Sequence, residues 1–512
     1  MRRTAFPAAP LLSLLGLLAA GCASGPIDYP RNYSEVITDT GDTRLAADVA
    51  QWQQRHPGSA GFYPLISGHD ALGARLALIA AAERSIDAQY FLMKSDLAGV
   101  LFAGSLLDAA DRGVRVRFLL DDVFTSVDDK ALLLLDRHPN VEVRLFNPIG
   151  RGGFYYLNYV ADFKRANRRM HNKSFTVDNQ ISIVGGRNIA DEYFELMSGS
   201  EFRDFDMVAA GPVAGEIAKT FDRYWNHALA VPVEAFAFGK EQPDLEKVRR
   251  EVAEELGDQA RSAYARAVDS PLVQHLIDDR VDMFPAAFEV ITDEPDKLVN
   301  SISAEQQTLV TRMAEIVSKA ESEVIVLTPY FIPGEAGVEF WRALTARGVR
   351  VIILTNSLAS NNHIPVHAGY ARYRHDVIRA GVELYETRVD AVDAPTAKDD
   401  PRFESVTLHT KAVMIDRRLF FVGSLNLDPR SIDINSEMGV LVDSADMAAA
   451  LAAPFLENLP ERAYRLQEDD RGRLRWHGVI DGQEVIEKNE PQAGQWRRFK
   501  AFLSRILPES QL

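Results

Sequence analysis

The chain has 512 residues, of which 57 are basic and 73 are acidic, and its formal net charge is −16. With 46% hydrophobic and 25% charged residues, its composition is that of an ordinary globular protein long enough for two or more domains. Because the chain is acidic overall, general binding of nucleic acid is disfavoured, and an anionic substrate would need a local basic site.

The N-terminus has the pattern of an export signal. Two arginines precede an apolar run that ends in "LAAGC" (18–22), the order typical of a secretory signal peptide. The ending resembles the bacterial lipobox, in which the cysteine is lipidated after cleavage, and Cys22 is the only cysteine, so it has no disulfide partner in the chain. A plain cleaved signal with a stray cysteine, or an uncleaved signal anchor, is the alternative. We expect a signal peptide over 1–21, a lipidated Cys22 with a tether over 22–45, and a periplasm-facing location in the bacterial cell envelope, with the outer membrane favoured over the inner.

Past the tether the chain repeats itself. "AAERSIDAQYFL" (81–92) is echoed by "KAESEVIVLTPYFI" (319–332), and "RGVRVRFLLDD" (112–122) is echoed by "RGVRVIILTNS" (347–357). Each unit alternates amphipathic helices with apolar strands, which predicts two similar α/β halves with mixed, mostly parallel sheets flanked by helices. The expected division is an N-terminal lobe over 46–238, a helical connection over 239–300 and a C-terminal lobe over 301–512.

The clearest echo joins "HNKSFTVD" (171–178) to "HTKAVMID" (409–416), which begin 238 residues apart, at His171 and His409. On a strand, residues two apart point to the same side, so the histidine and the lysine of each copy project together. In both copies the aspartate precedes a second strand, a turn of small residues and an asparagine. The positions are His171, Lys173, Asp178, Gly185 and Asn188 in the first copy, and His409, Lys411, Asp416, Gly423, Ser424 and Asn426 in the second. Two copies at matching places of two repeats predict one site between halves related by a pseudo-twofold axis.

Two such sets facing one small volume suit a phosphodiester. The lysines, the asparagines and Ser424 would hold the non-bridging oxygens, and the lysines would neutralise their charge. One imidazole would attack phosphorus to form a covalent phosphohistidine, while the other would protonate the leaving alkoxide and then activate the acceptor. Asp178 and Asp416 would either orient an imidazole or close a turn. The scheme needs no metal and no cofactor, and no cysteine pair or histidine cluster has the spacing of a zinc site.

These motifs resemble the signature of the phospholipase D superfamily. From about residue 60 onward the chain is similar to the cardiolipin synthase C type, as in "RRMHNKSFTVDNQISIVGGRNIADEYF" (168–194). The resemblance implies two phospholipase D-like lobes that move a phosphatidyl group between phospholipids, with phosphatidylglycerol as one substrate and phosphatidylethanolamine as a candidate for the other. By the same analogy Glu437 supports a catalytic histidine. Gly186 stands where many members have serine, so the halves need not be equivalent; we favour His171 as the nucleophile, and the sequence identifies no accessory protein.

Other functions stay open at this stage. A phospholipase D hydrolase would resolve the same intermediate with water and release phosphatidic acid. A nuclease is disfavoured by the acidic charge, the expected lipid anchor and the non-identical motifs. A non-catalytic lipid-binding protein is disfavoured because both motifs are complete.

Three further groups have both a functional and a structural interpretation. A basic cluster before the first motif would form a rim for headgroup phosphates or a solvated loop; it consists of Lys164, Arg165, Arg168 and Arg169. His363, His367 and Tyr370 would line the cleft or serve the core. The segment 495–508 predicts a basic amphipathic helix that lies on a membrane or, as we favour, packs on its own domain.

Overall fold

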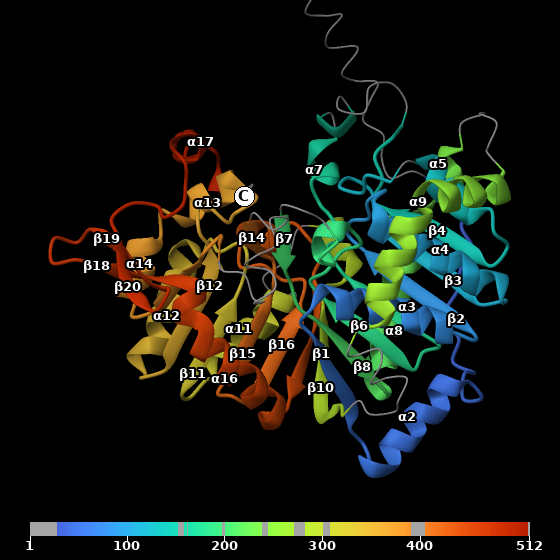
Figure 1. Ribbon diagram of the computed structural model, residues 1–512, viewed down its shortest axis with the longest axis horizontal. Helices are drawn as coiled ribbons and strands as arrows, with labels where there is room; N and C mark the ends of the chain where they lie inside the picture. Colours follow the sequence, from blue (N-terminus) through green and yellow to red (C-terminus); the bar gives the residue numbers. More distant parts are fainter. Residues whose placement is uncertain are drawn as a thin grey trace, which may run out of the picture.

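The computed structural model describes residues 28–127, 129–151, 158–160, 162–196, 200–237, 244–270, 282–300, 308–390 and 405–509 (Figure 1). The predicted signal peptide and its Cys22 lie outside these described residues. No helix in the described part of the chain combines the length and the apolar character needed to cross a bilayer.

The N-terminal half is built on one mixed sheet with the strand order β9–β4–β3–β2–β5–β6–β8–β1. The central strands β2, β3 and β4 pair in parallel, and the pairs to either side of them are antiparallel. The strands are β1 (Ala60–Leu65), β2 (Ser85–Tyr90), β3 (Arg115–Asp121), β4 (Val141–Phe146), β5 (Ser174–Val177), β6 (Ile181–Gly185), β8 (Asp206–Ala210) and β9 (Ala230–Pro232).

The C-terminal half repeats this order as β18–β13–β12–β11–β15–β16–β17–β10 and adds β19 beside β18 and β20 beside β19. The strands are β10 (Phe284–Thr292), β11 (Glu323–Leu327), β12 (Arg350–Asn356), β13 (Glu383–Thr387), β15 (Ala412–Ile415), β16 (Leu419–Gly423), β17 (Met438–Asp443), β18 (Ala463–Glu468), β19 (Leu474–Ile480) and β20 (Gln483–Glu487). A separate parallel pair joins the two halves and consists of β7 (Ser200–Arg203) and β14 (Ser405–Leu408).

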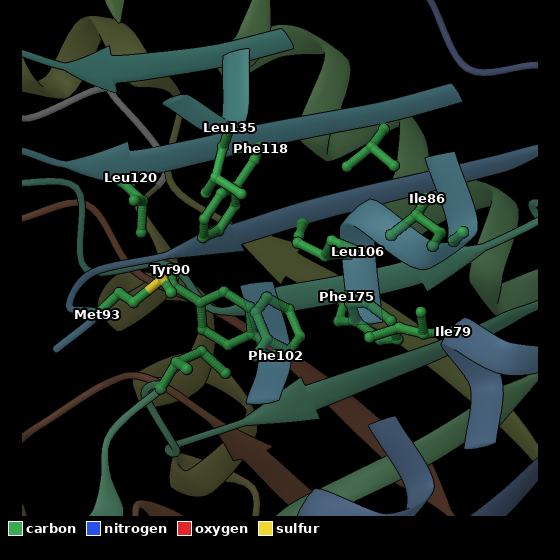
Figure 2. Close-up of a cluster of buried hydrophobic side chains, with 14 of the residues drawn as sticks. Ile79, Ile86, Tyr90, Met93, Phe102, Leu106, Phe118, Leu120, Leu135 and Phe175 are labelled. Carbon is green, nitrogen blue, oxygen red and sulfur yellow. The ribbon is translucent and has the colours of Figure 1, made fainter. Parts of the chain in front are cut away.

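Helices flank both faces of the two sheets (Figure 1). In the N-terminal half they are α2 (Arg44–Arg55), α3 (Gly68–Ala81), α4 (Leu97–Asp111), α5 (Asp129–Asp136), α7 (Phe163–Ala166), α8 (Pro212–Trp225) and α9 (Leu245–Val268). In the C-terminal half they are α11 (Leu309–Ser318), α12 (Gly334–Ala346), α13 (Ile364–Tyr370), α14 (Arg374–Arg379), α15 (Pro429–Asp433), α16 (Ala445–Arg462) and α17 (Gln495–Ser504). The helices α8 and α16 contribute to the apolar core between the sheets, whereas α3, α4, α5 and α9 pack on the outer face of the first sheet. Figure 2 shows how α4 is anchored: the Phe102 ring lies 5.8 Å from the ring of Tyr90 and 5.9 Å from that of Phe175.

The two halves meet through equivalent strands. β1 and β10, which occupy the same position in the two sheets, pair antiparallel with Phe62 opposite Phe284. The inner faces of the sheets share one apolar core that includes Phe62 and Met207 from the first half and Met414 from the second. An antiparallel pair of equivalent strands is what a pseudo-twofold axis requires, and it brings the two motif-bearing hairpins to the same interface.

The predicted fold class of two similar α/β lobes is confirmed. The expected predominance of parallel pairs is wrong, because each motif folds into a hairpin, β5–β6 or β15–β16, and antiparallel neighbours follow on both sides of the parallel core. The connection expected over 239–300 contains the helix α9, but it also contains β10, an apolar strand that pairs with β1 and β17.

Candidate active site

Each motif histidine is positioned by the backbone of the opposite half. The His171 N–H donates to the Ser436 carbonyl at 3.0 Å, next to a parallel bridge between Met170 and Ser436. His409 follows β14, and its N–H donates to the Arg203 carbonyl at the end of β7 at 2.7 Å. The site therefore exists only when the two halves are assembled.

The imidazoles are held in a crossed arrangement. Nδ1 of His171 lies 2.8 Å from Oε2 of Glu437 in the second half, and Nδ1 of His409 lies 2.5 Å from Oδ2 of Asp204 in the first half. All four side chains are buried. With Nδ1 occupied by a carboxylate, Nε2 is the nitrogen of each ring that can transfer a proton or attack phosphorus; that of His409 also has Lys411 Nζ at 3.2 Å.

Asp204 was not recognised from the sequence, although Glu437 was. The two acids are structural equivalents. The motif glycine Gly185 pairs with Asp206, and Gly423 pairs with Gly439. Asp204 and Glu437 each lie two residues before the partner of the glycine. Aligning the strands that follow the two motifs would have revealed an aspartate in one half at the place of a glutamate in the other.

The exchange of serine for glycine at position 186 follows from this difference between the acids. A Cβ at Gly186 would collide with the Asp204 carboxylate, whereas Ser424, in the equivalent place, donates its Oγ–H to Glu437 Oε2 at 2.5 Å. The shorter aspartate thus reaches its histidine by occupying the space that a serine would fill. Ser424 was predicted to bind phosphate; its hydroxyl is instead committed to Glu437.

Both motif lysines are buried beside their histidines. Lys173 Nζ donates to the His171 carbonyl at 2.7 Å, and Lys411 Nζ donates to the His409 carbonyl at 2.5 Å and lies 3.0 Å from His409 Nδ1. Burial lowers the pKa of Lys173 to about 7 and that of Lys411 to about 8. The charge of each lysine also lowers the pKa of the histidine in the opposite half.

The lysines predict how activity depends on pH. An amine with a lowered pKa is charged below that pKa and neutral above it, so kcat/KM for an anionic lipid should fall as the pH rises past about 7 to 8. Arginine stays charged over this range, so Lys173→Arg and Lys411→Arg should each flatten the alkaline limb while lowering the plateau. Initial rates between pH 6 and 10 test this; an alkaline limb unchanged in both variants would contradict it.

The acid partners differ in charge state. Burial raises the pKa of Glu437 to about 7. Burial would also raise the pKa of Asp204, but the hydrogen bond from Nδ1 of His409 and the charge of Lys411 lower it, so Asp204 stays ionised. Burial lowers the pKa of both histidines, to about 3 for His409. The free site therefore holds neutral imidazoles, which is the nucleophilic form, and an arriving phosphate charge would favour protonation.

The motif asparagines face the same region. Asn188 and Asn426 are buried, and the side-chain oxygen of each has no hydrogen-bond partner among the described residues. Asn188 donates its amide to Tyr193 Oη at 2.9 Å, and the Tyr193 ring lies 5.2 Å from that of His409. Buried polar groups without partners are costly, and since an amide can present either end, these two are suited to phosphate oxygens.

The motif aspartates do not take part in this cluster. The Asp178 carboxylate accepts the N–H groups of Glu83, Arg84 and Ser85 at 2.7 to 3.0 Å, before β2. Asp416 does the same for residues 321–323 before β11. Each aspartate lies seven positions after its histidine along extended chain, roughly 20 Å away. The predicted catalytic role is therefore wrong, and the alternative, closing a turn, describes both residues.

Removing one of these caps should cost stability and not chemistry. We expect Asp178→Ala to lower the free energy of unfolding by about 3 kcal/mol, because three backbone donors lose a carboxylate acceptor, and to lower Tm by several degrees. The rate per folded molecule should stay within about threefold of wild type. Thermal unfolding and activity are measured together, with the exposed Asp258→Ala as the control; a large loss of rate at unchanged Tm would contradict the structural role.

Gly185 and Gly423 are needed for close backbone approach. A Cβ at Gly185 would collide with the backbone of Phe205 and Asp206, and one at Gly423 would collide with the backbone of Met438. These glycines let the motif hairpin lie against β8 or β17, which carries the supporting acid into reach of the histidine.

The remaining candidates fall mostly on the structural side. Of the basic cluster, Arg165, Arg168 and Arg169 bind backbone or acidic groups of the protein, while Lys164 is exposed. His367 bonds Arg374, and Tyr370 donates to Glu386, within the second lobe. The helix expected over 495–508 does pack on its own domain, where α17 contacts α13, but its apolar face is exposed.

Within the described ranges, no three His, Cys, Asp or Glu side chains are grouped so as to hold a metal ion. The site instead brings together the imidazoles of His171 and His409, the amines of Lys173 and Lys411 and the amides of Asn188 and Asn426. Such a set can bind a phosphodiester, attack it and protonate its leaving group.

Comparison with known proteins gives consistent matches. A family model described as "Cardiolipin synthase, PLD-like domain" matches residues 76–225 and 313–459. The chain is 38% identical over 469 residues to cardiolipin synthase C of Escherichia coli (strain K12), covering 91% of this chain and 98% of that protein. It is 28% identical over 403 residues to cardiolipin synthase A of Pseudomonas aeruginosa (strain LESB58), covering 77% and 67%. The crystal structure of phosphatidylserine synthase from Haemophilus influenzae Rd KW20 matches 91% of this chain and 100% of its own, with a TM-score of 0.55 at 12% identity, and so shares the fold.

Proposed function

Because the chain belongs to the cardiolipin synthase family of phospholipase D-like proteins, we propose that it makes cardiolipin by transferring a phosphatidyl group onto phosphatidylglycerol. The observation that carries this proposal is the crossed pair of histidines. Each has Nδ1 on a carboxylate of the opposite half and lies beside a buried lysine.

In the first step, Nε2 of His171 attacks the phosphorus of the donor lipid. The N–P bond forms as the P–O bond to the headgroup alcohol breaks, and protonated His409 gives its Nε2 proton to the departing oxygen. In the second step, His409 takes the hydroxyl proton of phosphatidylglycerol, whose oxygen attacks phosphorus while the N–P bond breaks. The products are cardiolipin and the donor's headgroup alcohol, with both histidines restored.

The nucleophile is assigned from the unequal acid partners. Ionised Asp204 stabilises an imidazolium, so it suits His409 as the group that carries the proton. Glu437, with its pKa raised to about 7 and an accepted bond from Ser424, gives His171 less support for a positive charge. A neutral His171 is the better nucleophile, which agrees with the preference drawn from the sequence.

Lipid mass spectrometry tests the activity. Purified protein is incubated with vesicles of labelled phosphatidylglycerol, with and without phosphatidylethanolamine, beside His171→Ala and His409→Ala. Labelled cardiolipin from the wild type alone supports the transferase, and a dependence on phosphatidylethanolamine makes that lipid the donor. Phosphatidic acid without cardiolipin would make the protein a hydrolase, and no lipid turnover would contradict both assignments.

The location is proposed from the N-terminal sequence. Cys22 would carry the lipid and hold the protein at the periplasmic side of the bacterial outer membrane. Membrane fractionation of cells that express wild type or Cys22→Ser tests this proposal, and recovery of wild type in the inner-membrane fraction would contradict the outer-membrane assignment.

A further inference from the structure

The C-terminal helix α17 and the turn that follows it expose a continuous apolar face. Trp496, Phe502 and Ile506 are 66%, 63% and 84% exposed. The six exposed large apolar side chains of this segment are Trp496, Phe499, Phe502, Leu503, Ile506 and Leu507. We call these six the α17 face. A patch of this kind on a water-soluble surface marks a contact with an apolar partner.

The same helix carries positive charge that the protein does not neutralise. Arg498, Lys500 and Arg505 are exposed, and none of them forms an ion pair with an acidic group in the described part of the chain. In a protein whose net charge is −16, three unpaired cations beside an apolar face are complementary to an anionic lipid surface.

The helix is fixed to the loop that borders the second motif. Arg497 donates to the Leu358 carbonyl at 2.5 Å and to the Asn361 carbonyl. In the same loop, the Ser360 carbonyl accepts the hydroxyl of Thr407 at 2.7 Å, and Thr407 lies in β14, the strand that leads into His409. The α17 face is therefore attached rigidly, one loop away from the catalytic strand.

The first half presents exposed apolar side chains near its own motif. The ring of exposed Phe124 lies 5.1 Å from that of Phe91, which in turn lies 4.8 Å from the His171 ring. Exposed Phe163 begins α7, the short helix that precedes the first motif. Figure 1 shows α7 and α17 at the same end of the molecule as β7 and β14.

We infer that this end of the molecule docks on an anionic phospholipid bilayer, with the α17 face buried in the headgroup and acyl boundary and with Arg498, Lys500 and Arg505 on lipid phosphates. Docking is independent of the predicted anchor at Cys22 and of the chemistry. It would place the end of the molecule that carries β7 and β14 against the lipid surface.

Trp496 supplies a local reporter, because the other four tryptophans are buried. Full-length Cys22→Ser protein is mixed with phosphatidylglycerol vesicles whose acyl chains are brominated, and tryptophan emission is recorded. With the helix sequence unchanged, we expect Trp496 emission to shift to the blue and to be quenched. The double variant Phe502→Glu, Ile506→Glu should bind the vesicles about tenfold more weakly. Arg498→Gln and Lys500→Gln should each bind roughly fivefold more weakly.

Two controls separate docking from other causes. Ile486→Glu changes an exposed apolar residue of β20 outside the α17 face and should bind as wild type does. His409→Ala should also bind normally, so a failure of the proposed transferase would leave this result intact. Unquenched emission from protein that floats with the vesicles, or equal quenching by phosphatidylcholine vesicles, would overturn the inference. A blue shift that grows with protein concentration without lipid would overturn it in favour of contact between two copies.

Discussion

Replacing either histidine of the pair by alanine should lower phosphatidyl transfer at least about 10⁴-fold. His171→Ala removes the nucleophile, so the covalent intermediate cannot form, and His409→Ala leaves the departing alkoxide without a proton donor. Because the two residues act on one reaction path, the double variant should be no slower than the slower single variant. Rates are measured from labelled lipid products under single-turnover conditions.

The matched control for this prediction is His375→Ala. His375 lies half-exposed on α14, paired with Glu468 and away from both motifs. It should leave the rate unchanged within a factor of about two. More than about one tenth of wild-type activity in either motif variant, with folding intact, would show that the reaction does not pass through both imidazoles.

Asp204→Asn is expected to lower kcat by about 10² to 10⁴-fold, with a much smaller change in KM. The amide keeps the shape of the carboxylate but cannot stabilise the imidazolium of His409 or fix its tautomer. In the His409→Ala background the same substitution should cost almost nothing further, because the group through which Asp204 acts is gone.

Glu437→Gln provides the comparison within the same site. Since burial already raises the pKa of Glu437 to about 7, removing its charge should cost less, about 10 to 100-fold. kcat profiles between pH 5 and 9 for both variants make the test. Equal losses for the two substitutions, or near wild-type kcat in Asp204→Asn, would contradict the unequal roles.

The internal repeat made much of the fold predictable. The echoed helices and strands fall where the sequence places them, and the 238-residue offset predicts two lobes and a composite site. What the repeat could not supply was strand direction within each sheet. Strands joined by hairpins and strands joined by parallel crossovers have similar apolar sequences, so the sequence does not reveal their direction. Here each motif forms a hairpin, and most pairs outside the parallel core are antiparallel.

In the site, spacing identified the histidines and lysines because they are close in sequence and share one side of an extended segment. The same reasoning gave the wrong role for Asp178 and Asp416. A four-residue strand lies between each lysine and its aspartate, so the aspartate is at the far end of the hairpin. Asp204 went unrecognised because it contacts a histidine 205 residues away. Its relation to Glu437 emerges only from paired strands, and the two side chains differ in length.

Mapping the covalent intermediate tests whether His171 carries the phosphatidyl group. Enzyme mixed with phosphorus-labelled donor lipid is quenched with alkaline denaturant within milliseconds, digested and analysed by mass spectrometry. We expect a phosphatidyl adduct on the peptide that contains His171, formed and lost at rates that match turnover. An adduct on His409, or cardiolipin that accumulates with no adduct on either histidine, would contradict it.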